Sequence, residues 1–138
     1  MADGFLLALQ KGVRAALASD AGVTALVSSR IYDEPPHDVV FPYVRFNEIA
    51  PDAFDTDTTE GSRVSFSLEA HSRSSSGRVE AAQVMEAIKN ALHRQESSIT
   101  VEGFNLIEVI FLTFNVTRNS EGRGHLGVIA FQAMLEDA

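Results

Sequence analysis

The stretch from Ser62 to Leu92 most strongly constrains the fold, because its hydrophobic period changes once along its length. Polar and apolar residues alternate in the first part, as in a half-buried strand, and the apolar members are Val64, Phe66, Leu68 and Ala70. Beyond a serine-rich segment, apolar residues recur at spacings of three and four, as on one helical face: Ala81, Met85, Ile88 and Leu92. The sequence therefore predicts a strand that leads into a long amphipathic helix, with the two apolar faces packed together.

The composition fits one soluble domain spanning residues 1–138. The chain has 138 residues, of which 45% are hydrophobic and 22% charged, enough for one core of ordinary size. It has no cysteine, which excludes disulfides and thiolate metal sites. The formal net charge of −8, with 11 scattered basic residues, argues against general binding to nucleic-acid phosphates. The N-terminal segment lacks the basic region of a signal peptide, and no apolar run is long enough to cross a membrane.

Two helices are expected ahead of the opening stretch. Large apolar residues repeat every four positions from Phe5 to Leu17, with Asp3 as the expected N-cap, and this helix should end near Ser19. Asp20 is placed to cap a second, short helix. The N-terminal region is therefore interpreted as a helical hairpin packed on the core.

The remaining strands are expected from alternating or β-branched segments. They cover residues 40–49, 99–101, 104–118 and 125–135, with a short extended piece at 31–32. Strands joined by short turns pair antiparallel. The predicted fold is a single α+β domain of element order ααββαβββ, in which a mostly antiparallel sheet packs against one long helix and the N-terminal hairpin.

No catalytic, cofactor-binding or metal site is predicted from the histidines. They lie on four different expected elements, without the helical spacing of many metal ligands: His37, His71, His93 and His125. His71 is expected to be the last outward residue of its strand. His93 is expected at the surface at a helix end, where a cation is favourable.

Two further segments resemble chemical motifs only in part. The serines from Ser72 to Ser76 lack a nucleophile elbow and are interpreted as a loop that ends in an N-cap, at Ser75 or Ser76. The glycines from Gly122 to Gly127 precede a strand rather than a helix, so they indicate a hairpin turn and not a phosphate loop.

The segment from Ala50 to Gly61 is the most unusual loop. It contains four acidic residues and no basic one, and it joins two expected strands. Calcium loops of the EF-hand type need a glycine at the sharp turn and flanking helices, so a solvated acidic loop is the better interpretation. Long loops in compact domains are usually functional or disordered. Phe54 is the one large apolar residue that this loop offers to a partner.

The layout resembles a family of small tailed-phage proteins known as tail terminators or tail completion proteins, which includes gene transfer agent homologues. The matching elements are an N-terminal helix leading to residues 16–27, a proline-bearing loop, an acidic threonine-rich loop, the strand 64–71 and the helix 79–92. The most specific pieces are Arg-Ile-Tyr-Asp at 30–33 and Phe-Pro-Tyr-Val at 41–44. The last two strands match by pattern only.

The resemblance implies a structural role and no catalysed reaction. It implies a homohexameric ring at the head-proximal end of a tail tube, which ends tube polymerisation and meets a head-side connector or stopper protein. DNA would pass through the lumen without specific binding, and the acidic charge suits that role. The protein would be made in the host bacterial cytoplasm and reside in the virion tail, with no membrane contact and no cofactor.

The resemblance also directs attention to two loops as contacts with neighbours or with the tube. They are the segment 51–61 and the turn 119–124, and the residues expected to interact are Asp52, Phe54, Asp55, Asp57, Glu60, Glu121 and Arg123. Two alternatives stay open. Another ring-forming head–tail adaptor or a tube-like protein would share the layout, and a tube protein would form open-ended polymers. A small ligand-binding or enzymatic α+β domain would instead show a deep pocket with convergent polar groups.

Overall fold

The computed structural model describes residues 4–51, 61–73, 78–118 and 124–137. The helices are α1 (Phe5–Ser19), α2 (Ala21–Val27), α3 (Val79–Leu92) and the short 3-10 helix η1 (Glu96–Ser98). The strands are β1 (Ile31–Tyr32), β2 (Tyr43–Pro51), β3 (Gly61–Ser72), β4 (Phe104–Arg118) and β5 (His125–Asp137). The domain is α+β as predicted.

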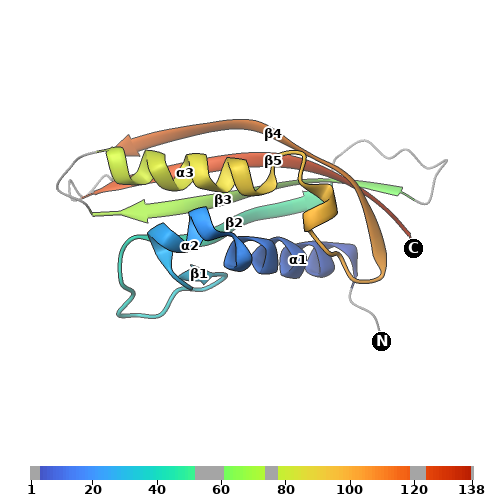
Figure 1. The fold of residues 1–138 in the computed structure, drawn as a ribbon, viewed down its shortest axis with the longest axis horizontal. Helices are drawn as coiled ribbons and strands as arrows, with labels where there is room; N and C mark the ends of the chain where they lie inside the picture. Colours follow the sequence, from blue (N-terminus) through green and yellow to red (C-terminus); the bar gives the residue numbers. More distant parts are fainter. Residues whose placement is uncertain (1–3, 52–60, 74–77, 119–123, 138) are drawn as a thin grey trace.

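The five strands form one sheet in the order β1-β2-β3-β5-β4. All neighbours pair antiparallel except β1 and β2, which are parallel. The three α-helices lie in front of the sheet in Figure 1, with α1 beside β1 and β2 and α3 over β3, β4 and β5. The described helices therefore cover one face of the sheet, and the core lies between that face and the helices.

The strand and helix of the opening stretch form as predicted. The alternating apolar residues of β3 are at most 2% exposed, and the predicted helical face of α3 is fully buried. The ring of Phe66 stacks on that of Phe131 in β5, with 5.3 Å between centroids. Burying each such large side chain contributes about 1.5–3 kcal/mol. The two elements are the centre of the core, as the change of period indicated.

The N-terminal helices also follow the sequence pattern. Leu9, Val13 and Leu17 of α1 are buried. The carboxylate of Asp20 accepts a hydrogen bond from the Val23 N–H at 3.0 Å, so the predicted cap of α2 is confirmed. The N-cap of α1 is Gly4, which makes no side-chain hydrogen bond, whereas the expected cap Asp3 lies outside the described residues.

Two local predictions are wrong. Residues 99–101 are not a strand: they follow η1 as an extended connection, and Ile99 and Val101 are buried beneath α1 without pairing to the sheet. Their alternation therefore reflects burial and not sheet pairing. The fifth strand of the sheet is β1, which was expected only as a short extended piece. The N-cap of α3 is Arg78, not Ser75 or Ser76, and it makes no side-chain hydrogen bond. The first-turn residue Glu80 instead accepts a hydrogen bond from the Ser72 hydroxyl at 2.7 Å.

Candidate functional site

The residues predicted to interact with partners lie outside the described part of the chain. Asp52, Phe54, Asp55, Asp57 and Glu60 fall within 52–60, and the remaining two, Glu121 and Arg123, fall within 119–123. The structure fixes where these segments attach. The first joins β2 to β3 after Pro51, and the second joins β4 to β5 before Gly124. Their contacts remain predictions.

Among the described residues, no group of three or more histidine or acidic side chains is placed to hold a metal ion. His71 and His93 take part in specific contacts instead, while His125 is 7% exposed and its Nδ1 has no hydrogen-bond partner in the described structure. His93 does stand at the C-terminal end of α3, but it is half-buried, and its Nδ1 accepts a hydrogen bond from the Phe111 N–H at 3.0 Å. The prediction of a plain surface histidine there was wrong.

A cluster of aromatic and arginine side chains lies on the sheet face that the helices leave open, at the end where β2 begins. We call it the aromatic–arginine cluster, and its members are Tyr32, Phe41, Tyr43, Arg45, His71 and Arg73. The strand register builds it, because Tyr32 on β1 lies beside Arg45, and Tyr43 lies opposite His71. The ring of Tyr43 is 6.0 Å from that of Tyr32 and 5.2 Å from that of Phe41.

One acidic side chain, that of Glu69, lies against this cluster. Glu69 Oε1 lies 2.9 Å from Nε2 of His71, and the imidazole stacks on Tyr43 with 4.7 Å between centroids. Burial raises the pKa of the Tyr43 hydroxyl, the nearby carboxylate of Glu69 adds to the rise, and Arg45 and Arg73 oppose it.

The arginines of the cluster differ in how they are held. The guanidinium of Arg73 lies over the Phe41 ring, 4.4 Å from its centroid. Arg45 lies opposite Glu69 in the register, yet its Nε is buried without a hydrogen-bond partner in the described structure. Buried donors in native proteins almost always have an acceptor. Among the described residues, Arg45 Nε therefore stands out as a buried donor without an acceptor.

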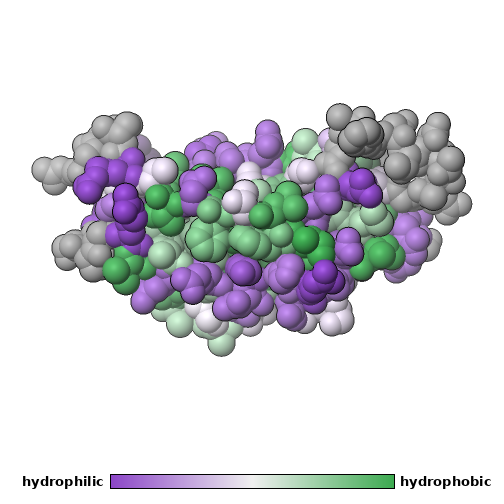
Figure 2. Space-filling view, turned by 90° about the horizontal axis from the view of Figure 1, so that it is seen from above, coloured by the Kyte–Doolittle hydropathy of each residue, from purple (hydrophilic) through white to green (hydrophobic). Residues whose placement is uncertain are grey.

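The long edge strand β4 is a second surface feature. Its outer side is covered near the middle, where the N–H of Val109 donates to Glu96 Oε2 at 3.0 Å and the carbonyl of Val109 accepts from Arg94 N–H at 2.9 Å. Ile107 and Leu112 remain 47% and 51% exposed. Figure 2, seen from the β4 side, shows a band of apolar surface across the middle of the molecule. The connection between α3 and β4 thus occupies part of the β4 edge, which could otherwise pair with a strand of another molecule.

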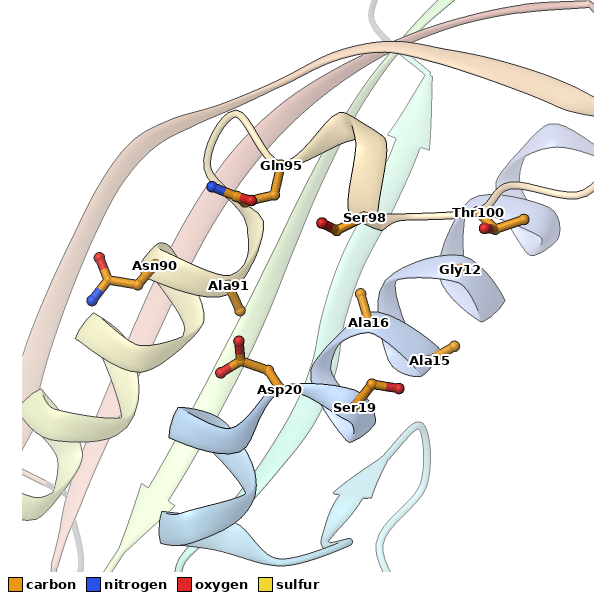
Figure 3. Close-up of a pocket in the computed structure, with 10 residues that line it drawn as sticks. All are labelled: Gly12, Ala15, Ala16, Ser19, Asp20, Asn90, Ala91, Gln95, Ser98 and Thr100. Carbon is orange, nitrogen blue, oxygen red and sulfur yellow. The ribbon is translucent and has the colours of Figure 1, made fainter.

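An open groove lies between α1, the C-terminal half of α3 and η1 (Figure 3). Its volume is about 410 Å³, and its lining is small or polar: Gly12, Ala15, Ala16, Ser19, Asp20, Asn90, Ala91, Gln95, Ser98 and Thr100. Asp20 is the one charged side chain in this lining, and its carboxylate already caps α2. A smaller hollow of about 340 Å³ adjoins it. Neither has the convergent polar groups of an active site.

A family model for the tail completion protein gp17 matches residues 11–136. The chain belongs to this family. Its members are structural proteins of phage tails and not enzymes. In the same part of the chain, no helix is long and apolar enough to cross a membrane.

Solved structures support the assignment. A chain from the virion of a native gene transfer agent particle is 25% identical to this protein, with a TM-score of 0.84, and the match covers 98% of this chain and 99% of that one. The gp17 protein of bacteriophage SPP1 shares the fold at 22% identity and a TM-score of 0.60, covering 92% of this chain and 88% of its own. A search of curated protein sequences gave no match.

The aromatic–arginine cluster was not predicted from the sequence, although a signal for it was present. The two short pieces that carry the family resemblance, 30–33 and 41–44, supply Tyr32, Phe41 and Tyr43. What the sequence does not reveal is the register that sets Tyr43 opposite His71. Without that register, the partners of the motif residues could not be named.

Proposed function

We propose that this protein forms a ring at the head-proximal end of a tail tube, where it ends tube polymerisation and joins the tail to the head. The observation that carries the proposal is the near-complete match to a chain of a gene transfer agent virion, with a TM-score of 0.84 over 98% of this chain. Membership of the tail completion family supports the same role.

The proposed partners are further copies of this chain, the tail tube protein and a head-side connector or stopper protein. A ring in this place must let DNA pass through its lumen. The net charge of −8 favours this, because an acidic wall repels phosphates and does not retain DNA. The proposed number of copies is six.

The experiment that tests the proposal is imaging with and without the tube protein. We expect closed rings, alone or on tube ends, in negative-stain images, and tubes that stop growing when the protein is added. Light scattering in solution measures the copy number. A strict monomer that neither forms rings nor binds tube ends contradicts the proposal.

A second candidate is another ring-forming head–tail adaptor, which the same virion match also allows. The two roles differ in which partner is bound. A terminator binds tube ends and limits tube length, whereas an adaptor binds the head-side connector and leaves tube growth unchanged. Measuring tube length distributions with the purified protein therefore separates them, and open-ended polymers of this protein alone would indicate a tube role.

A further inference from the structure

The sheet has two edges that are each covered over one half only. β1 pairs with the second and third residues of β2, so residues 46–51 have no strand on their outer side in the described structure. The connection between α3 and β4 covers β4 as far as Phe111, and no described residue bonds to the outer backbone of 112–118. Figure 1 shows β2 and β4 on opposite sides of the sheet. Uncovered edges of this kind are templates for pairing with another chain.

Both free halves direct backbone donors and acceptors outward. In β2 the N–H of Val44 points outward to the residue before β1, and the bulge that follows adds one residue, so Ile49 takes the outward position. In β4 the N–H of Phe111 points outward to His93, and the bulge that follows likewise gives the outward position to Val116. The side chains of Ile49 and Val116 are both partly buried against the core, on the helix-covered face.

The positions of the free halves set the geometry of a contact between copies. Within one chain the register places Ile49 level with Phe66 of β3, and Val116 level with Ala70. Bringing Val116 of a neighbour beside Ile49 therefore shifts that neighbour along the strands from 66 to 70, by about 13 Å. The neighbour is also displaced across β2, β3, β5 and β4, by about 19 Å. The two displacements correspond to a strand tilt of about 35°, and strands in closed barrels tilt by about 35–45°.

We propose that copies of this chain join edge to edge, with the free half of β2 in one copy paired antiparallel to the free half of β4 in the next. The inference rests on the proposed ring, for which it names the contact. β2 and β4 run in opposite directions within one sheet, so copies that join in this way keep their helices on the same face. Ile49 lies opposite Val116 on that face, and Ala50 lies opposite Asn115 on the open face.

The covered half of β2 fixes the register of this contact. Arg118, the last residue of β4, lies opposite Phe46, just beyond the residues of β2 that β1 occupies. Face-matched registers differ by two residues, because a shift by one turns every side chain to the other face. A shift of two residues toward β1 would run the end of β4 into Tyr32. A contact between two different edges closes into a ring when the rotation between copies closes.

The first arm of the test is disulfide cross-linking of the full chain, which has no cysteine of its own. In the variant A50C/N115C the two positions of one chain lie three strand spacings apart, about 14 Å, whereas a disulfide spans at most about 7 Å between Cα atoms. Each bridge must therefore join two copies. We expect mild oxidation to give a ladder of covalent oligomers on a nonreducing gel. The matched control is A50C/E108C, because Glu108 lies on the same face of β4 in its covered half, and it should stay monomeric.

The second arm removes one outward donor. V116P loses the N–H that faces the neighbour, and proline is tolerated where the N–H of an edge strand points outward. V116A loses the same side chain and keeps the N–H, so it is the matched control. Light scattering should show association of V116P weakened roughly tenfold relative to V116A, since a hydrogen bond is lost and the proline ring hinders the approach of β2.

Three results would overturn the edge-to-edge contact. They are the absence of cross-linked oligomers from A50C/N115C at millimolar protein, equal cross-linking in A50C/E108C, and an equal yield from N115C alone, which would mean that two β4 edges pair. Rings that persist in images without these cross-links leave the terminator role standing and contradict only the contact. Cross-linked rings that do not bind tube ends contradict only the terminator role. The two proposals can therefore fail separately.

Discussion

The imidazole of His71 lies flat on the ring of Tyr43, with 6° between the two planes and 4.7 Å between their centroids. The same imidazole is hydrogen-bonded to Glu69 at 2.9 Å. The pair ties β3 to the start of β2 and shields Tyr43, which is only 7% exposed although no described helix covers this face. The pair therefore holds the two strands together and forms the buried base of the aromatic–arginine cluster.

Replacing His71 with alanine should destabilise the fold by about 1 kcal/mol, because an aromatic pair and a hydrogen bond are lost. The measurement is urea unfolding at neutral pH. The matched control is His37→Ala, since His37 is exposed in the loop before β2. An equal effect of both substitutions would mean that the stack contributes nothing specific.

The Tyr43 hydroxyl predicts a pH dependence. Burial raises its pKa above the ordinary value of 10.0, so the folded protein holds this proton at a pH where the unfolded chain has released it. The contribution is complete below pH 10 and is lost as the pH rises through the folded pKa. Unfolding free energy of the wild type should therefore fall more steeply above pH 10 than that of Tyr43→Phe, and parallel curves would contradict this account.

Gly12 is required by a close approach of two backbones. A Cβ at this position would lie 2.4 Å from the carbonyl oxygen of Thr100, which a side-chain rotation cannot relieve. Gly12→Ala should therefore cost about 1–3 kcal/mol in urea unfolding, as overpacking does. Gly4→Ser is the control, because nothing lies within 4 Å of its Cβ, and serine and glycine differ at an N-cap by only about a few tenths of a kcal/mol. Equal stability of the two variants would show that α1 can move away from the connection.

The covered edge of β4 leads to a prediction about solubility. His93→Ala and Glu96→Ala each leave one β4 N–H without its acceptor, and each should destabilise by about 1 kcal/mol. The double variant also uncovers a strand edge flanked by Ile107 and Leu112, so it should aggregate on mild heating, as light scattering would show. Glu102→Ala, an exposed acid in the turn before β4, should do neither. A soluble double variant would show that the edge needs no cover.

Sequence-based prediction succeeded in the segments whose apolar residues repeat with a regular period. Val64 to Ala70 and Ala81 to Leu92 could be assigned because each has one buried face, and burial imposes the period. Residues 99–101 alternate for the same reason, yet they pack under α1 and pair with no strand, so periodicity misled there. The aromatic–arginine cluster depends on pairing between residues far apart in the chain, and such a register leaves no local pattern to read.

The acidic segment of residues 52–60 allows a prediction that separates a role in folding from a role in assembly. Replacing residues 52–60 with a short glycine–serine linker should leave the fold intact, because β2 and β3 already pair from Tyr43 opposite His71 to Pro51 opposite Val64, outside the replaced segment. The unfolding free energy should change by less than about 0.6 kcal/mol, the effect of a modest change in loop length. Ring formation and binding to tube ends should be lost. An equal-length replacement of 119–123 tests the other proposed loop separately. If the linker variant fails to fold, as judged by circular dichroism and amide spectra, the segment has a structural role and its assignment to assembly is wrong.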